Sequence, residues 1–138
     1  MAEHSGAQRA PLSQAAALVI GIVYVVLGIG GFFAGGKEIL VFHTGVLLDI
    51  MRTAIGLLAL VAARRGAAAQ VIELVTFFGL AGLTVYGILS TATGDPVDVR
   101  GLLDVQWADN ILHGVTAIAG LVFGLLPARR RSSAAPRV

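Results

Sequence analysis

The sequence contains no cysteine, which excludes disulfides, thiolate metal sites and cysteine nucleophiles. Charged residues are also scarce, at 13% of 138 residues, whereas hydrophobic residues make up 57%. With a mean hydropathy of +0.86, this composition lies outside the range of ordinary soluble domains. The sequence has no Gly-rich phosphate loop and no nucleophile–base set, and its polar loops are too short for a soluble catalytic domain. We therefore expect a non-enzymatic protein without cofactors.

The apolar residues fall into four runs, each long enough to cross a hydrocarbon core of ~30 Å at ~1.5 Å per residue. Because backbone groups find no water in a bilayer and no run alternates like a strand, each run is predicted to be a helix. The predicted spans are residues 12–33, 42–63, 67–89 and 107–126. The first run is longer than the ~7–15 apolar residues of a cleaved signal peptide, so we expect it to be retained. The predicted fold class is an all-α bundle of four transmembrane helices in two antiparallel hairpins.

Around this transmembrane domain (11–128), we expect a disordered cytoplasmic leader (1–10) and a basic cytoplasmic tail (129–138). Arginine and lysine are concentrated on one side of the predicted spans. That side holds Arg9, Arg64, Arg65, Arg129, Arg130, Arg131 and Arg137, and the other side holds Lys37 and Arg100. The positive-inside rule therefore predicts that both termini are cytoplasmic. Acidic residues are expected to form a rim on the outer loops: Glu38, Asp95, Asp98, Asp104 and Asp109.

The second run carries charged residues inside its apolar sequence. Small and charged residues recur there at intervals of four and three: Gly45, Asp49, Arg52, Gly56, Ala59 and Ala63. This spacing places them on one helical face, which is typical of packing against protein. Asp49 and Arg52 can pair as i, i+3 neighbours, which removes part of the cost of burying charge in a membrane. The pair is interpreted as a clasp that fixes helix register, with a binding or relay site as the alternative.

A shift of 61 residues, from Asp49 to Asn110, aligns this face with the fourth run. Arg52 then matches His113, and small residues follow on both faces. The match suggests an internal duplication of a helical hairpin. Asn110 is able to hydrogen-bond across helices. His113 is able to accept from Arg52, to donate to Asp49 or to titrate near neutral pH.

Glu73 stands apart, near the cytoplasmic end of the third run. We expect its side chain to extend toward Arg64 or Arg65 at the membrane surface. The alternative is that Glu73 forms the inner station of a proton or ion path whose outer station is Asp49 with His113.

Two tyrosines and a further histidine complete the candidates. Tyr24 and Tyr86 offer hydroxyl groups near the polar face, with Tyr86 closer to the outside. His43 and His113 lie on different predicted helices, and a haem or metal site would need both rings to face one pocket. His43 falls off the Asp49 face by about 120°, from a helical step of ~100° per residue, so neither a metal nor a haem is expected.

Two segments resemble a known family: ADNILHGVTAIAG (108–120) and LLDIMRTAIGLLAL (47–60). They are similar to small four-helix membrane proteins of actinobacteria that are catalogued only as a domain of unknown function. In that family, an Asn-x-x-His pair recurs near the start of the last helix before a glycine-rich apolar run. Asn110 and His113 match the pair, whereas Asp49 and Arg52 in the second run depart from it. The resemblance covers residues 11–129 and implies an integral protein of a bacterial plasma membrane, without implying an activity.

Two functions remain as hypotheses. The first is a packing or accessory subunit, or a self-associating bundle, with a polar clasp in the outer half of the membrane. Its partners would be the lipid bilayer and either further copies of the chain or a larger membrane complex. The alternative is a small transporter or ion- or proton-conducting protein that uses Asp49, Arg52 and His113. A nucleic-acid partner is not expected, because the basic residues stand at helix ends rather than on a soluble patch.

Overall fold

The computed structural model describes residues 12–35, 42, 45–93 and 106–126. They form four helices: α1 (Leu12–Ala34), α2 (Val46–Ala62), α3 (Gly66–Thr93) and α4 (Trp107–Leu125). The predicted all-α, four-helix class is therefore confirmed. The expected leader and basic tail, and all of the acidic rim except Asp109, lie outside the described residues.

Three of the helices are long and apolar enough to cross a membrane, namely α1, α3 and α4. The remaining helix, α2, has 17 residues, which corresponds to ~26 Å at ~1.5 Å per residue. It begins at Val46 instead of near residue 42, because the backbone of Gly45 is extended, with φ −122° and ψ 140°. This shorter helix is the one that carries Asp49 and Arg52.

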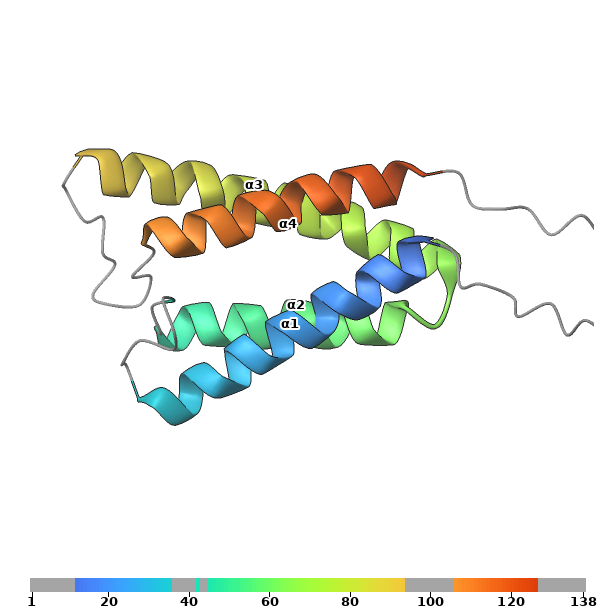
Figure 1. Ribbon diagram of the computed structural model, residues 1–138, viewed down its shortest axis with the longest axis horizontal. Coiled ribbons are helices and arrows are strands. Elements are labelled where there is room, and N and C mark those ends of the chain that lie inside the picture. Colours follow the sequence, from blue (N-terminus) through green and yellow to red (C-terminus); the bar gives the residue numbers. More distant parts are fainter. Residues whose placement is uncertain (1–11, 36–41, 43–44, 94–105, 127–138) are drawn as a thin grey trace, which may run out of the picture.

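The helices are arranged as two antiparallel hairpins, α1 with α2 and α3 with α4 (Figure 1). Residues 63–65 link α2 to α3 at the end of the bundle where α1 begins and α4 ends, which we call the turn end (Figure 1). At the opposite end, which we call the cap end, α2 and α4 begin. The described residues nearest the two chain termini therefore lie at the same end of the bundle.

Glycines bring the two helices of each hairpin into backbone contact. A Cβ atom at Gly56 of α2 would lie 2.6 Å from the backbone nitrogen of Val25 on α1. A Cβ atom at Gly120 of α4 would likewise lie 2.6 Å from the carbonyl oxygen of Glu73 on α3. Side-chain carbons do not approach so closely, so only glycine permits this packing. The small-residue face predicted for the second helix therefore faces a protein neighbour.

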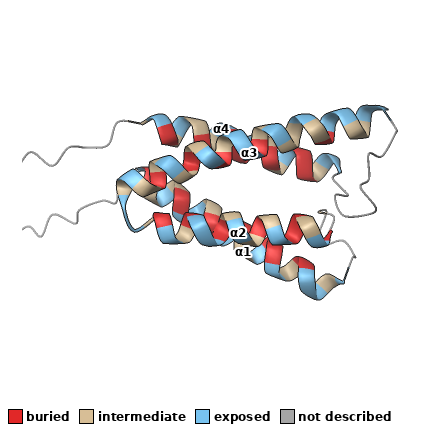
Figure 2. Cartoon of the chain, turned by 180° about the vertical axis from the view of Figure 1, so that it is seen from behind, coloured by how far each residue is buried: buried red, intermediate tan, exposed pale blue. Residues whose placement is uncertain are grey.

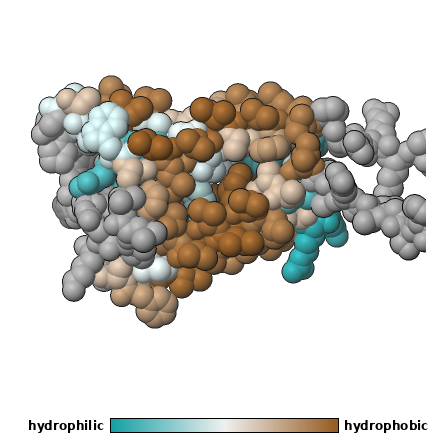
Figure 3. Space-filling view, viewed as in Figure 1, coloured by the Kyte–Doolittle hydropathy of each residue, from teal (hydrophilic) through white to brown (hydrophobic). Residues whose placement is uncertain are grey.

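The interior and the surface differ sharply in character. Each helix has buried residues along one side and exposed residues along the other (Figure 2). Tyr24, Leu80 and Ala117 form the centre of the apolar core and come from three different helices. The outward-facing side chains include large apolar residues on every helix, and the space-filling view shows a largely hydrophobic surface (Figure 3). Such an apolar exterior suits lipid.

Candidate functional site

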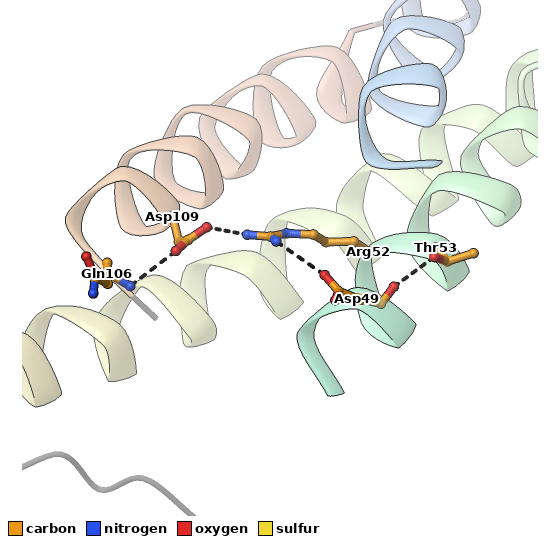
Figure 4. Close-up of polar contacts among 5 residues, drawn as sticks. All are labelled: Asp49, Arg52, Thr53, Gln106 and Asp109. Carbon is orange, nitrogen blue, oxygen red and sulfur yellow. Dashed lines mark hydrogen bonds and ion pairs between the residues drawn. The ribbon is translucent and has the colours of Figure 1, made fainter. Parts of the chain in front are cut away.

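The bulkiest fully buried side chain belongs to Arg52 of α2, which is 1% exposed. Its Nη2 atom donates to Oδ1 of Asp109 on α4, and its Nη1 atom lies 3.6 Å from Oδ1 of Asp49 (Figure 4). Within the described residues, the backbones of α2 and α4 do not pack directly on each other. The arginine side chain therefore bridges the interior and links the two hairpins.

Asp109 has two roles at the start of α4. It is fully buried, its Oδ1 atom accepts from Arg52, and its Oδ2 atom accepts from the backbone N–H of Gln106 at 3.2 Å (Figure 4). Together with the Gln106 side chain it forms a capping box at the helix N-terminus. One carboxylate thus serves as the helix cap and as the counterion of the arginine.

The prediction that Asp109 belongs to an exposed acidic rim is therefore wrong. Its position in the first turn of α4 suggested a loop residue at the membrane surface. The signal that was overlooked is helical spacing, because Asp109 precedes His113 by four residues and Ala117 by eight, on the same face. That face is the one α4 buries.

Asp49 completes the charged group, which we call the clasp: Asp49, Arg52 and Asp109. Asp49 is 2% exposed and is covered by α1 at Gly31, where any Cβ atom would overlap its carboxyl group. Both acids lie in the first turn of their helices, at the cap end, where the positive ends of the two helix dipoles favour negative charge. Two carboxylates thus share one guanidinium and two helix N-termini.

Asn110 and His113 lie on the same buried face of α4. The hydrogen bond across helices that was predicted for Asn110 is formed, whereas the contacts of His113 differ from the prediction. Nδ2 of Asn110 donates to Oγ1 of Thr91 on α3 at 3.2 Å. The ring of His113 is fully buried, with its centroid 6.4 Å from that of Tyr24. Neither ring nitrogen of His113 has a hydrogen-bond partner among the described residues, so the expected bonds to Arg52 or Asp49 are not formed.

The other two candidates belong to α3. Tyr86 is only partly buried on α3. Glu73 is 1% exposed and faces the interior near the turn end. The expected extension of Glu73 toward Arg64 or Arg65 is wrong, since both arginines are exposed and the Glu73 carboxyl group is enclosed.

The described part of the chain contains no group of three or more histidine, aspartate or glutamate side chains that could hold a metal ion. His43, which was weighed as a haem or metal ligand, lies outside the described residues. Among the described residues, the site combines a buried ion pair with polar atoms, such as the ring nitrogens of His113, that make no hydrogen bond to them.

A four-helix bundle with three apolar helices of membrane-spanning length, an apolar exterior and charges enclosed in its interior fits the class of helical membrane proteins. The chain belongs to the family described as a domain of unknown function, DUF4383, whose model matches residues 14–126. The resemblance to a family of unknown function is confirmed, while an actinobacterial origin stays a prediction. Neither the curated proteins nor the solved structures include a match to this chain.

Proposed function

We propose that the chain is a non-enzymatic membrane protein that associates with further copies of itself, with the clasp holding its two hairpins in one orientation. In this proposal all four helices cross a bacterial plasma membrane and both termini lie in the cytoplasm. The observation that carries the proposal is the side chain of Arg52, which extends from α2 in one hairpin to Asp109 of α4 in the other. An interior ion pair of this kind contributes orientation more than net stability.

The exterior supports a packing role. Large apolar side chains point outward from every helix, and Phe33 and Phe78 are 88% and 72% exposed. Helices in lipid associate through van der Waals packing and do not need polar anchors, so such a surface is compatible with both lipid and a second copy. The same surface would also suit a role as an accessory subunit in a larger complex with other membrane proteins.

Self-association is tested with purified protein reconstituted into liposomes. Energy transfer between donor- and acceptor-labelled copies is expected to persist when lipid is added at constant protein and to fall when unlabelled protein is added. Native mass spectrometry from a mild detergent should show the same oligomer. A strictly monomeric species in both measurements would contradict the proposal.

A second function is favoured by one specific observation: some buried polar atoms have no hydrogen-bond partner among the described residues. Oδ1 of Asn110 and both ring nitrogens of His113 belong to this set. Burying such a group without a partner costs roughly 1–3 kcal/mol, so water or a small polar solute is the natural partner. A proton- or ion-conducting protein that uses Asp49, Arg52 and His113 would have such an interior.

This second function is tested by flux in proteoliposomes that contain a pH-sensitive dye. If the chain conducts protons, His113→Ala and Asp49→Asn should lower the rate of acidification at least tenfold while leaving the helical circular dichroism unchanged. Wild-type protein with a rate equal to that of empty liposomes would exclude conduction. Variants that lose only stability would show that these residues have a structural role.

A further inference from the structure

Glu73 is an enclosed carboxyl group on the buried side of α3. Its side chain is 1% exposed, and the buried residues Ala69, Thr76 and Leu80 lie on the same side of the helix. The backbone of α4 passes directly against it at Gly120, where a Cβ atom would lie 2.6 Å from the Glu73 carbonyl oxygen. The backbone of Ala17 on α1 faces the carboxyl group, and neither Oε atom has a side-chain partner in the described chain.

No cation in the described helices lies beside this carboxyl group. Residues 12–34 of α1 and residues 114–125 of α4 contain no charged side chain, and Glu73 is the sole charged residue of α3. On α2, the residues from Thr53 to Ala62 are uncharged, and the arginines of the turn that follows are exposed. The titratable groups that these helices do carry, namely the tyrosines and the clasp with His113, belong to the core and the cap end.

Arg52 is too far away to serve as the counterion. Its partner Asp109 stands 11 residues before Gly120 on α4, which is ~16 Å at ~1.5 Å per residue. The arginine is also occupied at that end by Asp109 and Asp49. An ionised Glu73 would thus be an isolated charge in an apolar interior, and such a group takes up a proton instead of paying the full cost of desolvation.

The surroundings of Glu73 also contain small hydroxyl groups. Ser13 of α1, four residues before Ala17 on the same helical face, is 6% exposed, and Thr76 is 5% exposed one turn after Glu73. Ser13 lies in the first turn of α1 and thus at the turn end of the bundle. Hydroxyl groups both donate and accept, so they are suited to pass a proton between the carboxyl group and the water beyond the helix ends.

We propose that Glu73 is an intramembrane proton-binding site, separate from the clasp, that holds an exchangeable proton at neutral pH. Its ligand is a single proton delivered from the turn end. The site does not depend on self-association or on conduction through His113, because its residues and its end of the bundle are different. It gives the protein a group that changes charge inside the apolar core.

Infrared difference spectroscopy on reconstituted protein tests the proposal. The spectrum of wild type minus Glu73→Gln at neutral pH is expected to contain the C=O stretch of a protonated carboxyl group, and this band should shift when the buffer is changed to D₂O. The variant Glu73→Asp should restore the band. His113→Ala should leave it unchanged. A carboxylate band at neutral pH, or a protonated band that does not shift in D₂O, would overturn the proposal.

A reagent that needs no variant provides a second measurement. A hydrophobic carbodiimide reacts with a protonated carboxyl group in a bilayer: the carboxyl oxygen bonds to the central carbon and the proton passes to a nitrogen. The adduct rearranges to a stable acylurea, and no other reactant is consumed. Mass spectrometry should find the adduct on Glu73 and not on Asp49 or Asp109, with a yield that falls about tenfold per pH unit on the alkaline limb of the titration. Labelling of the two aspartates without Glu73 would overturn the proposal.

Discussion

Arg52 forms the ion pair between the two hairpins, and the energetics of this pair follow from its burial. Taking a guanidinium and two carboxylates out of water costs several kcal/mol per ion, on the order of what their mutual attraction returns. The contribution to stability is therefore small as long as all partners are present. Removing one partner leaves an uncompensated charge in the interior, which is the expensive case.

This reasoning predicts a strong coupling between Arg52 and Asp109. Arg52→Met and Asp109→Asn should each lower the free energy of unfolding by about 3–5 kcal/mol, and the double variant by clearly less than the sum. Asn at position 109 keeps an oxygen for the helix cap, so the cycle isolates the charge. Unfolding in mixed micelles is followed by circular dichroism and by the fluorescence of Trp107, the single tryptophan of the chain. Additive losses would show that the two side chains act independently.

The neighbouring hydrogen bond between Asn110 and Thr91 should matter much less. Hydrogen bonds between membrane helices contribute on average ~0.6 kcal/mol, because the competing states also find partners. We therefore expect Thr91→Val to lower the free energy of unfolding by under about 1 kcal/mol in the same assay. A loss as large as that of Asp109→Asn would mean that the amide, and not the ion pair, connects the helices at the cap end.

At the level of the helices, the structure separates glycines that are needed for packing from glycines that are not. Gly56 and Gly120 lie where two backbones meet, and a methyl group at either would require the helices to separate. Gly79 and Gly82 of α3 have no neighbouring atoms within 4 Å of a Cβ position. Replacing glycine by alanine should therefore lower the free energy of unfolding at the first two positions and raise it at the other two.

We predict that Gly56→Ala and Gly120→Ala lower the free energy of unfolding by about 1–3 kcal/mol, the range for overpacking an interior. Gly79→Ala is the matched control, and it should raise stability by about 0.5–1 kcal/mol because alanine favours the helix. All three variants are compared by thermal unfolding in one detergent. Equal effects at positions 56 and 79 would show that the close contact between α1 and α2 is absent in the bilayer.

At the scale of the whole molecule, the antiparallel arrangement of the four helices places the start of α1 and the end of α4 at the same end of the bundle, the turn end. The positive-inside rule predicts that this side is cytoplasmic, because most arginines stand next to the start of α1, the α2–α3 turn and the end of α4 in the sequence. The absence of cysteine makes this assignment easy to test, since any introduced thiol is the only one in the chain.

Two exposed alanines near opposite ends of α3, Ala67 and Ala92, provide the positions. In intact cells, a thiol reagent that does not cross membranes should label Ala92→Cys and leave Ala67→Cys unlabelled. After permeabilisation both should react, and the wild-type chain should never react. Labelling of Ala67→Cys alone in intact cells would show that the protein has the opposite orientation. Labelling of both variants in intact cells would show that α3 does not span the membrane.

Much of the architecture follows from local patterns that a sequence displays directly. Apolar runs of sufficient length predicted the helices, and the spacing of small residues predicted which side of α2 faces protein. The internal duplication stays a prediction. The ends of the helices were harder to predict from the sequence. The extended backbone at Gly45 shortens α2, and nothing in the surrounding apolar run indicates it.

The pairing within the site depended on tertiary structure. The sequence by itself determined that Asp49 and Arg52 share one helical face and that Asn110 and His113 share another, because helical periodicity is a property of the chain. Only the packing of the hairpins decided that Arg52 pairs with Asp109, and that Glu73 is enclosed beneath α1 and α4 instead of meeting the turn arginines. The physical reason is that a long side chain chooses its partner by distance in space, and this distance is set by where the glycines let the backbones meet.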